Sequence, residues 1–220
     1  MRADIRADMR EAMKTEETLH TLTTLASLRA LYPAPKERAV RKQLDHLDVH
    51  CRRFIELAPF VVLASSGADG AMDASPRGGG TGFVKAPDAH TLLIPDAPGN
   101  HRLDTLENSV ATGRLGMLLM VPGVDETLRV NGAAQLTTDP TLIEQVADER
   151  RRPSVVIWVR VEQAYLHCAK AFMRSRLWSA QAQVERSVLP TMGRMISEQT
   201  GLAGADETKE QMLARYQVDL

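Results

Sequence analysis

The chain has 220 residues, of which 44% are hydrophobic and 25% are charged, as in a globular protein built on one large domain with or without additions. Its formal net charge of −1 gives no electrostatic reason to expect nucleic acid or an anionic membrane surface as a partner. No stretch approaches the ~18 uninterrupted apolar residues that span a bilayer. The charged N-terminus lacks the apolar core of a signal peptide. We therefore expect a cytoplasmic protein.

The two cysteines, Cys51 and Cys168, lie far apart in the sequence. No CxxC motif and no cluster of His and Cys has the spacing of zinc ligands, so no metal site is predicted. Two free thiols in a reducing cytoplasm are a plainer interpretation than a disulfide.

Two helices are predicted before residue 58. The first covers residues 16–31, where apolar residues recur at helical spacing, and it ends at the prolines of the Tyr32–Pro35 stretch. The second covers residues 36–57 and carries one apolar stripe along its whole length, which we expect to cover the side or end of a core. That stripe consists of Val40, Leu44, Leu47, Cys51 and Phe54.

After Pro59 the apolar period shortens, and short runs bounded by turn residues predict six strands. The turns follow too closely for βαβ units. The expected fold class is therefore mainly β with helical additions, as a closed or nearly closed six-stranded antiparallel barrel. A short helix is expected after the third strand, another over residues 139–150, and an interrupted helical tail over 180–216. The strands are predicted at residues 60–64, 71–75, 91–94, 115–121, 127–137 and 154–166.

Two arginine-bearing turns are the most informative feature. The first covers residues 73–80 and ends in a run of glycines, and the second covers residues 94–104. In the second, Asn100 is predicted as the N-cap of a helix, which places Arg102 in the first helical turn. The helix dipole disfavours a cation there, but an anion shared between that cation and the free amides would explain it.

The glycines after Arg77 would let a second backbone segment curl its amides around the same kind of ligand. We therefore predict a phosphate clamp formed by Arg77 and Arg102, with Ser75 and Asn100 adding hydrogen bonds. The alternative is a pair of solvated turn arginines. Leu103, Leu106 and Val110 would form the apolar face of the helix.

Other candidate residues leave two interpretations open. Arg129, on the polar face of its strand, would form a surface ion pair or reach a ligand at a subunit contact. His101 is either a base near the ligand or an ordinary exposed histidine. In the stretch 167–178, cations flank Trp178, which would pack on a planar ligand or an arginine, or else plug the barrel. Cys168 has cationic neighbours but no defined catalytic partner.

The order of these features resembles the FMN-binding split-barrel superfamily that includes pyridoxamine 5′-phosphate oxidase. The chain looks closest to a bacterial branch described as pyridoxamine 5′-phosphate oxidase-related and FMN-binding. The resemblance covers residues 55–180. Its matching segments are residues 75–78, 91–96, 98–104, Asn108, Gly116, 121–123, 126–132, Lys170 and 174–178.

The resemblance implies a homodimer that holds FMN non-covalently at the subunit contact. Backbone at residues 73–75 would run along the isoalloxazine, and the phosphate would lie at the helix start. Residues Thr127 and Arg129 would approach from the partner subunit. The implied cofactor-binding residues are Asp73, Ala74, Ser75, Arg77, Ile94, Pro95, Asn100, Arg102, Leu103, Thr127, Arg129, Lys170, Arg174 and Trp178.

The chain departs from the true oxidase, whose basic C-terminal segment grips the substrate phosphate, so oxidation of pyridoxamine phosphate is not supported. We expect a flavin-dependent oxidoreductase that acts on a small molecule, with no catalytic side chain identified. The alternatives are a flavin-binding sensor or carrier, and a barrel that binds haem or a deazaflavin. The expected organisation is a helical extension (1–57), the barrel (58–179) and a second helical extension (180–220).

Overall fold

A computed structural model describes residues 21–97, 99–149, 151–202 and 208–217. The chain divides into two units, Met1–Arg41 and Lys42–Leu220. The described part of the first unit contains two short helices, α2 (Leu25–Ala30) and α3 (Glu37–Arg41), neither with a buried residue. Helix α2 begins later than predicted because the Thr24 side chain caps it by accepting a hydrogen bond from the Ser27 amide. Residues 16–20 of the predicted helix lie outside the described residues.

The prediction of one continuous helix over residues 36–57 is wrong. After α3, Leu44 forms an isolated β-bridge with Ala164, with reciprocal backbone hydrogen bonds of 2.9 and 2.8 Å. A new helix, α4 (Val49–Leu57), then begins where Asp48 accepts a 2.7 Å hydrogen bond from the Cys51 amide. Pairing with a distant strand and a fresh N-cap therefore outweigh the local helical spacing.

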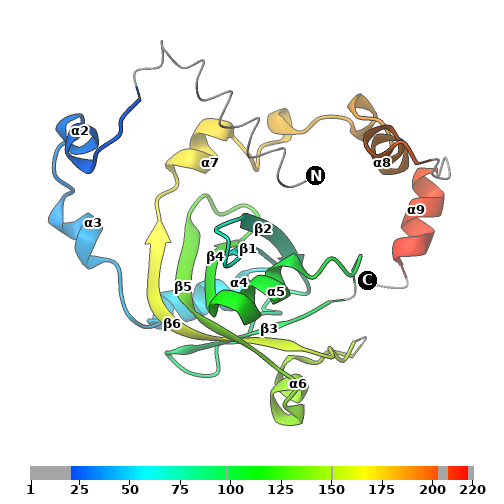
Figure 1. The fold of residues 1–220 in the computed structure, drawn as a ribbon, viewed down its shortest axis with the longest axis horizontal. Helices are drawn as coiled ribbons and strands as arrows, with labels where there is room; N and C mark the ends of the chain where they lie inside the picture. The colour runs from blue at the N-terminus through cyan, green and yellow to red at the C-terminus, as the bar shows by residue number, and fades with distance from the viewer. Residues whose placement is uncertain (1–20, 98, 150, 203–207, 218–220) are drawn as a thin grey trace. The chain divides into compact units, whose positions relative to one another are not determined.

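The six predicted strands are confirmed, with ends shifted by up to three residues. They form one sheet in the order β2-β1-β4-β5-β6-β3, and every neighbouring pair is antiparallel. The sheet curls into a split barrel whose two edges are β2 and β3 (Figure 1). The strands are β1 (Phe60–Ser66), β2 (Met72–Gly78), β3 (Thr91–Pro95), β4 (Arg114–Met120), β5 (Thr127–Thr137) and β6 (Val156–His167).

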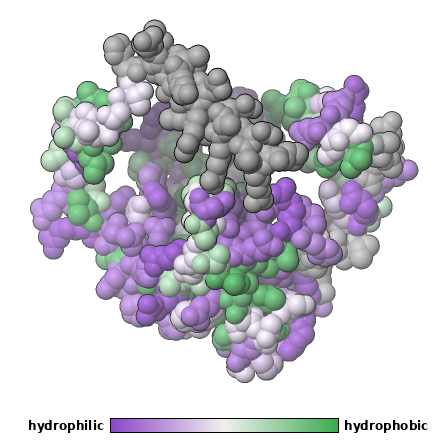
Figure 2. Space-filling model, viewed as in Figure 1, coloured by the Kyte–Doolittle hydropathy of each residue, from purple (hydrophilic) through white to green (hydrophobic). Residues whose placement is uncertain are grey.

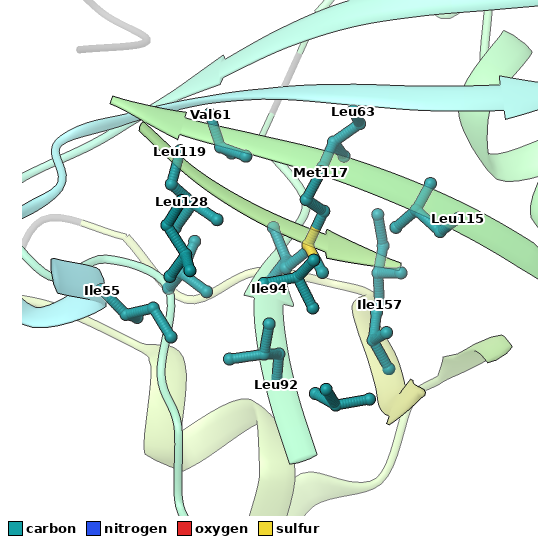
Figure 3. Close-up of a cluster of buried hydrophobic side chains, with 14 of the residues drawn as sticks. Ile55, Val61, Leu63, Leu92, Ile94, Leu115, Met117, Leu119, Leu128 and Ile157 are labelled. Carbon is teal, nitrogen blue, oxygen red and sulfur yellow. The ribbon is translucent and has the colours of Figure 1, made fainter. Parts of the chain in front are cut away.

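The hydrophobic core lies inside the curl of the sheet, where alternate residues of the strands point toward one another (Figure 3). Leu63, Leu119, Leu128 and Ile157 are all fully buried there, and Ile55 of α4 belongs to the same buried cluster. The pairing of β5 with β6 changes register between Asn131 and Gly132, where β6 contains one extra residue, Glu162.

Two further helices pack on the barrel. Helix α5 (Asp104–Thr112) contacts β1 and β5, and α6 (Pro140–Val146) contacts β3 and β6. Helix α6 confirms the helix predicted over 139–150 in a shorter form. It is capped by Asp139 and buries Ile143 and Val146 in a small second cluster that includes Trp158.

The predicted interrupted helical tail is confirmed. Within the described residues its elements are the 3-10 turns η2 (Ala180–Ala182) and η3 (Arg186–Val188), α8 (Met192–Thr200) and α9 (Lys209–Tyr216). A further short helix, α7 (Lys170–Ser175), precedes the tail. Apolar side chains lie on the surface of α2 and α8, including Leu25 and Ile196 (Figure 2). None of the described helices is long and apolar enough to cross a bilayer.

Candidate functional site

A groove of about 1050 Å³ lies along the open edges of the barrel. On β2, the residues that share a face with the buried Val61, Leu63 and Ser65 of β1 are Arg77, Ser75 and Asp73. A closed barrel would bury apolar side chains at these positions. The polar row therefore belongs to the split between β2 and β3, and it forms one wall of the groove.

The prediction that residues 73–80 form a turn is wrong for most of that stretch. Residues through Gly78 are paired with β1, as far as Phe60 opposite Gly78. Arg77 is half-buried, and its Nη1 donates to Ser75 Oγ at 2.5 Å and to the Pro76 carbonyl at 3.1 Å. Gly79 donates its amide to the Pro59 carbonyl, so this glycine amide is used within the fold.

The prediction of Asn100 as N-cap is also wrong. Helix α5 begins at Asp104, and Leu103 occupies the cap position with φ of 59°. Asn100 Oδ1 instead accepts a 3.1 Å hydrogen bond from the Arg102 amide, which closes a tight turn ahead of the helix. The predicted apolar face fails because Leu103 and Val110 are exposed (47% and 74%), and only Leu106 is buried.

Arg102 consequently lies before the helix rather than in its first turn. Its Nε donates to Asp104 Oδ2 at 2.8 Å, and Asp104 occupies the first helical position, where the dipole favours an acid. The hydrogen bond and charge of Asp104, with a smaller contribution from Asp73, raise the pKa of Arg102. The helix dipole therefore gives no reason to expect an anion at Arg102. The side chain still lines the groove and is 73% exposed.

A buried polar network holds the start of α5 against β1 and β2. Asp73 Oδ2 accepts from Thr105 Oγ1 at 2.7 Å and from Ser65 Oγ at 3.4 Å, and Asn108 Nδ2 donates to Ser65 Oγ at 3.0 Å. Thr105 and Ser65 are both buried. The network orients the Asp73 carboxylate and ties the start of α5 to β1 and β2. Sequence reasoning missed its assembly.

The opposite wall contributes residues that sequence reasoning did not single out. Asp96 follows β3, and its amide donates to the Val155 carbonyl at 3.0 Å, which extends the pairing with β6. Burial raises the pKa of Asp96, while Arg77, the Ala97 amide and Arg151 oppose that rise. Arg151 also lines this wall. The sequence feature that could have indicated this wall is the run of arginines at residues 150–152, but such a run usually belongs to a solvated loop.

Further side chains contribute to the lining. Arg152 is paired with Glu144 of α6. His101 is exposed in the turn before α5, with φ of 59°. Arg215 and Tyr216 of α9 also line the groove, and the Arg215 guanidinium lies 4.6 Å from the Tyr216 ring centre.

The structure brings seven of the fourteen predicted cofactor-binding residues into this groove. Ile94 and Pro95 are buried at the end of β3, directly before Asp96. The remaining five, Thr127, Arg129, Lys170, Arg174 and Trp178, are not lining residues of the groove. The seven are Asp73, Ala74, Ser75, Arg77, Asn100, Arg102 and Leu103.

The five residues outside the groove gather around the paired ends of β5 and β6 and the segment that follows. Thr127 is buried opposite His167, whose Nδ1 is buried with no hydrogen-bond partner among the described residues. The Arg129 guanidinium lies 5.3 Å from the Tyr165 ring centre. Arg129 is therefore exposed at the surface of the chain but packed on an aromatic ring.

Trp178 neither plugs the barrel nor packs on an arginine. Its Nε1 donates to the Val124 carbonyl at 3.0 Å, and its ring stacks on Phe172 with centroids 5.5 Å apart. Arg174 Nε donates to the Lys170 carbonyl at 3.0 Å, which closes α7 on itself.

The cysteines lie apart from the groove. Both are free thiols: Cys168 is exposed, and burial among core residues raises the pKa of the Cys51 thiol to about 12. Within the described residues, no three His, Cys, Asp or Glu side chains cluster as metal ligands would.

The sequence of the chain matches a known protein family. A family model described as pyridoxamine 5′-phosphate oxidase matches residues 47–168. No curated protein sequence matches the chain.

Among solved structures, HupZ of Group A Streptococcus is 15% identical, covers 54% of this chain and 92% of its own, and has a TM-score of 0.46. An FMN-binding protein of Syntrophomonas wolfei is 10% identical, covers 73% and 97%, and has a TM-score of 0.43. HutZ, the haem storage protein of Vibrio cholerae, is 10% identical, covers 55% and 93%, and has a TM-score of 0.39. At these identities and TM-scores, the three likenesses carry no conclusion about this chain.

Proposed function

This chain belongs to the pyridoxamine 5′-phosphate oxidase family, and on that basis we propose that it binds FMN non-covalently in the groove between β2 and β3. The observation that carries the proposal is the polar and cationic lining of an open barrel edge where a closed barrel would be apolar. Arginine and backbone amides are the donors that a phosphate monoester prefers.

The residues of the groove fit such a cofactor. The turn of Asn100 and Arg102 offers a guanidinium beside the start of α5, and we assign it to the phosphate. Backbone at Asp73, Ala74 and Ser75 would run along the isoalloxazine, with Pro95 at the end of β3 beside it. The bound flavin would supply the electron or hydride transfer, while the chain positions it and sets the polarity around it.

A homodimer accounts for the other predicted residues. The five that lie away from the groove would complete the site of the partner subunit rather than their own. The outward face of the sheet suits such a contact because it is apolar across three strands. Pro76 of β2, Val62 of β1 and Leu118 of β4 are in register there, and Phe60 lies opposite Met120.

We further propose that the protein is an oxidoreductase that acts on a small molecule other than pyridoxamine phosphate. The sequence lacks the basic segment with which the true oxidase binds the substrate phosphate, and this supports excluding pyridoxamine phosphate as the substrate. Hydride transfer to a flavin requires no obligatory side-chain acid or base, and no residue is assigned that role here.

The absorption spectrum of the purified protein tests the cofactor. A yellow protein that releases FMN on denaturation is expected. A colourless protein that fails to bind added FMN would refute the proposal, and a haem or deazaflavin spectrum would replace FMN by that ligand. For the FMN-loaded protein, reduction by a nicotinamide donor or a substrate at a useful rate separates an enzyme from a carrier.

A further inference from the structure

Two cations gather on one tyrosine ring at the end of β6. The Arg129 guanidinium lies 5.3 Å and the Lys42 Nζ lies 5.4 Å from the Tyr165 ring centre. Both distances are within the roughly 6 Å at which the face of an aromatic ring attracts a cation. Arg129 lies opposite Tyr165 in the β5–β6 pair, whereas Lys42 precedes α4 in the sequence. We call these three residues the Tyr165 cluster.

The barrel holds the backbone of this cluster in place. β3 pairs with only the first part of β6, and the end of β6 is bridged instead by Leu44, which pairs with Ala164. Lys42 lies two residues before this bridge, and its Nζ donates a 2.8 Å hydrogen bond to the Leu166 carbonyl. The other two members of the cluster are paired strand residues. The fold therefore brings the two positive charges together.

The residues that the structure describes do not neutralise these charges. No Asp or Glu among them forms an ion pair with Lys42 or Arg129. Arg114 of the neighbouring β4, by contrast, is paired with Glu162 at 2.7 Å. Two like charges beside one ring repel each other, and the attraction of the ring offsets only part of that repulsion. An anion bound beside the ring would relieve it.

The cluster presents three kinds of hydrogen-bond donor. Lys42 supplies an ammonium group, Arg129 a guanidinium group and Tyr165 a phenolic hydroxyl. Tyr165 is half-buried, and its hydroxyl has no hydrogen-bond partner in the described part of the chain. Charge-assisted hydrogen bonds from such cations to phosphate oxygens are stronger than hydrogen bonds between neutral groups. The donors therefore favour a phosphate group over an uncharged ligand.

The cluster continues the outward face of the sheet that we propose as the homodimer contact. Val62 lies opposite Leu118, and Leu118 lies opposite Arg129. Arg129 in turn lies opposite Tyr165. This row passes from apolar residues to the cluster, as an interface passes from its core to its polar rim. None of the three cluster residues lines the groove of its own chain. A phosphate group bound there would lie where the second subunit approaches.

We propose that the Tyr165 cluster binds a phosphate group, and that in the homodimer this group is the flavin phosphate held in the partner's groove. The second part rests on the proposed function. The first part does not, because it follows from the charges and donors of the cluster. Lys42 lies outside the residues 47–168 that match the family, so the family match does not imply its role.

Inorganic phosphate is the probe for the first part, with cofactor-free protein. The melting temperature is followed against phosphate concentration, with chloride at equal ionic strength as reference, since a ligand of the native state raises it by mass action. Lys42→Gln and Tyr165→Phe should each weaken phosphate binding about three- to tenfold, because each removes one donor. Lys85→Gln is the matched control. Its Nζ also donates to a backbone carbonyl, that of Gly82 at 2.9 Å, but lies outside the cluster. A phosphate response that is the same in all three variants would overturn the proposal.

Flavin binding tests the second part. Lys42→Gln should weaken FMN binding about tenfold and leave the affinity for riboflavin, which lacks the phosphate, within about twofold. Mixing Lys42→Gln subunits with Arg102→Ala subunits then identifies which chain supplies Lys42. In the mixed dimer, one site combines Arg102 from the first variant with Lys42 from the second, so high-affinity FMN binding should return at that site. If Lys42 served the groove of its own chain, no site would be complete, and FMN affinity would stay low in the mixture. That result would overturn the second part.

The two titrations together separate this proposal from the FMN assignment. If the protein binds no FMN but its phosphate response still depends on Lys42, the cluster stands as a phosphate site and the proposed cofactor fails. If FMN binds equally well to wild type and Lys42→Gln and their phosphate responses agree, the cluster fails and the cofactor stands.

Discussion

At the residue scale, the partner of each arginine determines what it can do. The sequence pattern placed Arg102 in a helical turn, where the dipole would disfavour it, but the structure places it two residues before Asp104, which pairs with it. Its value as a phosphate ligand then depends on the groove it lines rather than on relief of an unfavourable dipole.

Arg102→Ala should weaken FMN binding about ten- to a hundredfold, because a charge-assisted hydrogen bond to phosphate is lost. Riboflavin, which lacks the phosphate, should bind wild type and variant equally. The melting temperature of the apoprotein should change little, because an exposed ion pair contributes little to stability. Titrations that follow flavin fluorescence measure both affinities.

Arg53→Ala is the matched control for this variant. Arg53 forms an exposed ion pair with Glu56 and does not line the groove. It should leave FMN affinity unchanged. Equal losses of riboflavin and FMN affinity in Arg102→Ala would mean that Arg102 does not contact the phosphate.

At the element scale, caps and bulges set the ends of elements that periodicity alone misplaces. Asp48 is the N-cap of α4, although the apolar spacing of the sequence continues through this position without interruption. Gly132 lies at the bulge where β5 and β6 change register, and a Cβ there would lie 2.1 Å from the Arg160 carbonyl oxygen. Both positions stabilise the barrel without touching the groove.

Asp48→Ala should lower the free energy of unfolding by about 0.5–2 kcal/mol, the usual contribution of an N-cap. Burial disfavours ionisation of Asp48, but hydrogen bonds centred on the Cys51 amide outweigh it and lower the pKa of this carboxyl below its ordinary 3.8. A lowered native pKa stabilises the fold above the unfolded pKa, and that contribution is lost as the pH falls through the native value.

The difference between wild type and Asp48→Ala should therefore be complete at neutral pH and shrink in acid, below about pH 4. Denaturant unfolding at a series of pH values measures it. A difference that persists undiminished in strong acid would contradict the role of the ionised carboxylate.

Gly132→Ala should destabilise the barrel by about 1–3 kcal/mol or more, since the added methyl group meets backbone that cannot move without breaking the pairing of β5 and β6. The urea midpoint of unfolding measures the loss. Gly80→Ala is the control, because a Cβ at Gly80 meets no atom within 4 Å. A Gly132→Ala variant as stable as Gly80→Ala would show that the bulge accommodates a side chain.

At the scale of the whole molecule, the proposed homodimer would use the apolar outward face of the sheet as its contact surface. Val62→Glu combined with Leu118→Glu should shift the protein from dimer to monomer, because two buried charges would face each other across the contact. Light scattering after size-exclusion chromatography measures the mass.

The monomeric variant should also lose most of its FMN, since the partner's side of the site would be missing. Thr141→Glu, on the exposed start of α6, should leave both mass and FMN content unchanged. A wild-type monomer with stoichiometric FMN would refute the arrangement of the site between subunits.

The sequence by itself determined the strands and the fold class, because the two-residue period of a strand depends only on residues that are close in the sequence. It also pointed to Arg77, Arg102 and the segments around them. Periodicity could not show where helix 36–57 breaks, since that depends on Leu44 meeting Ala164 far along the chain.

Only the tertiary structure decided which charges meet in the groove. Arg77, Asp96 and Arg151 come from three separate segments, and the order of strands in the sheet leaves β2 and β3 as the open edges between which they gather. Electrostatic neighbours act through space, and no local pattern encodes distances between edges of a curled sheet. The sequence therefore indicated which arginines to consider as ligands, but it did not indicate which carboxylates they would meet.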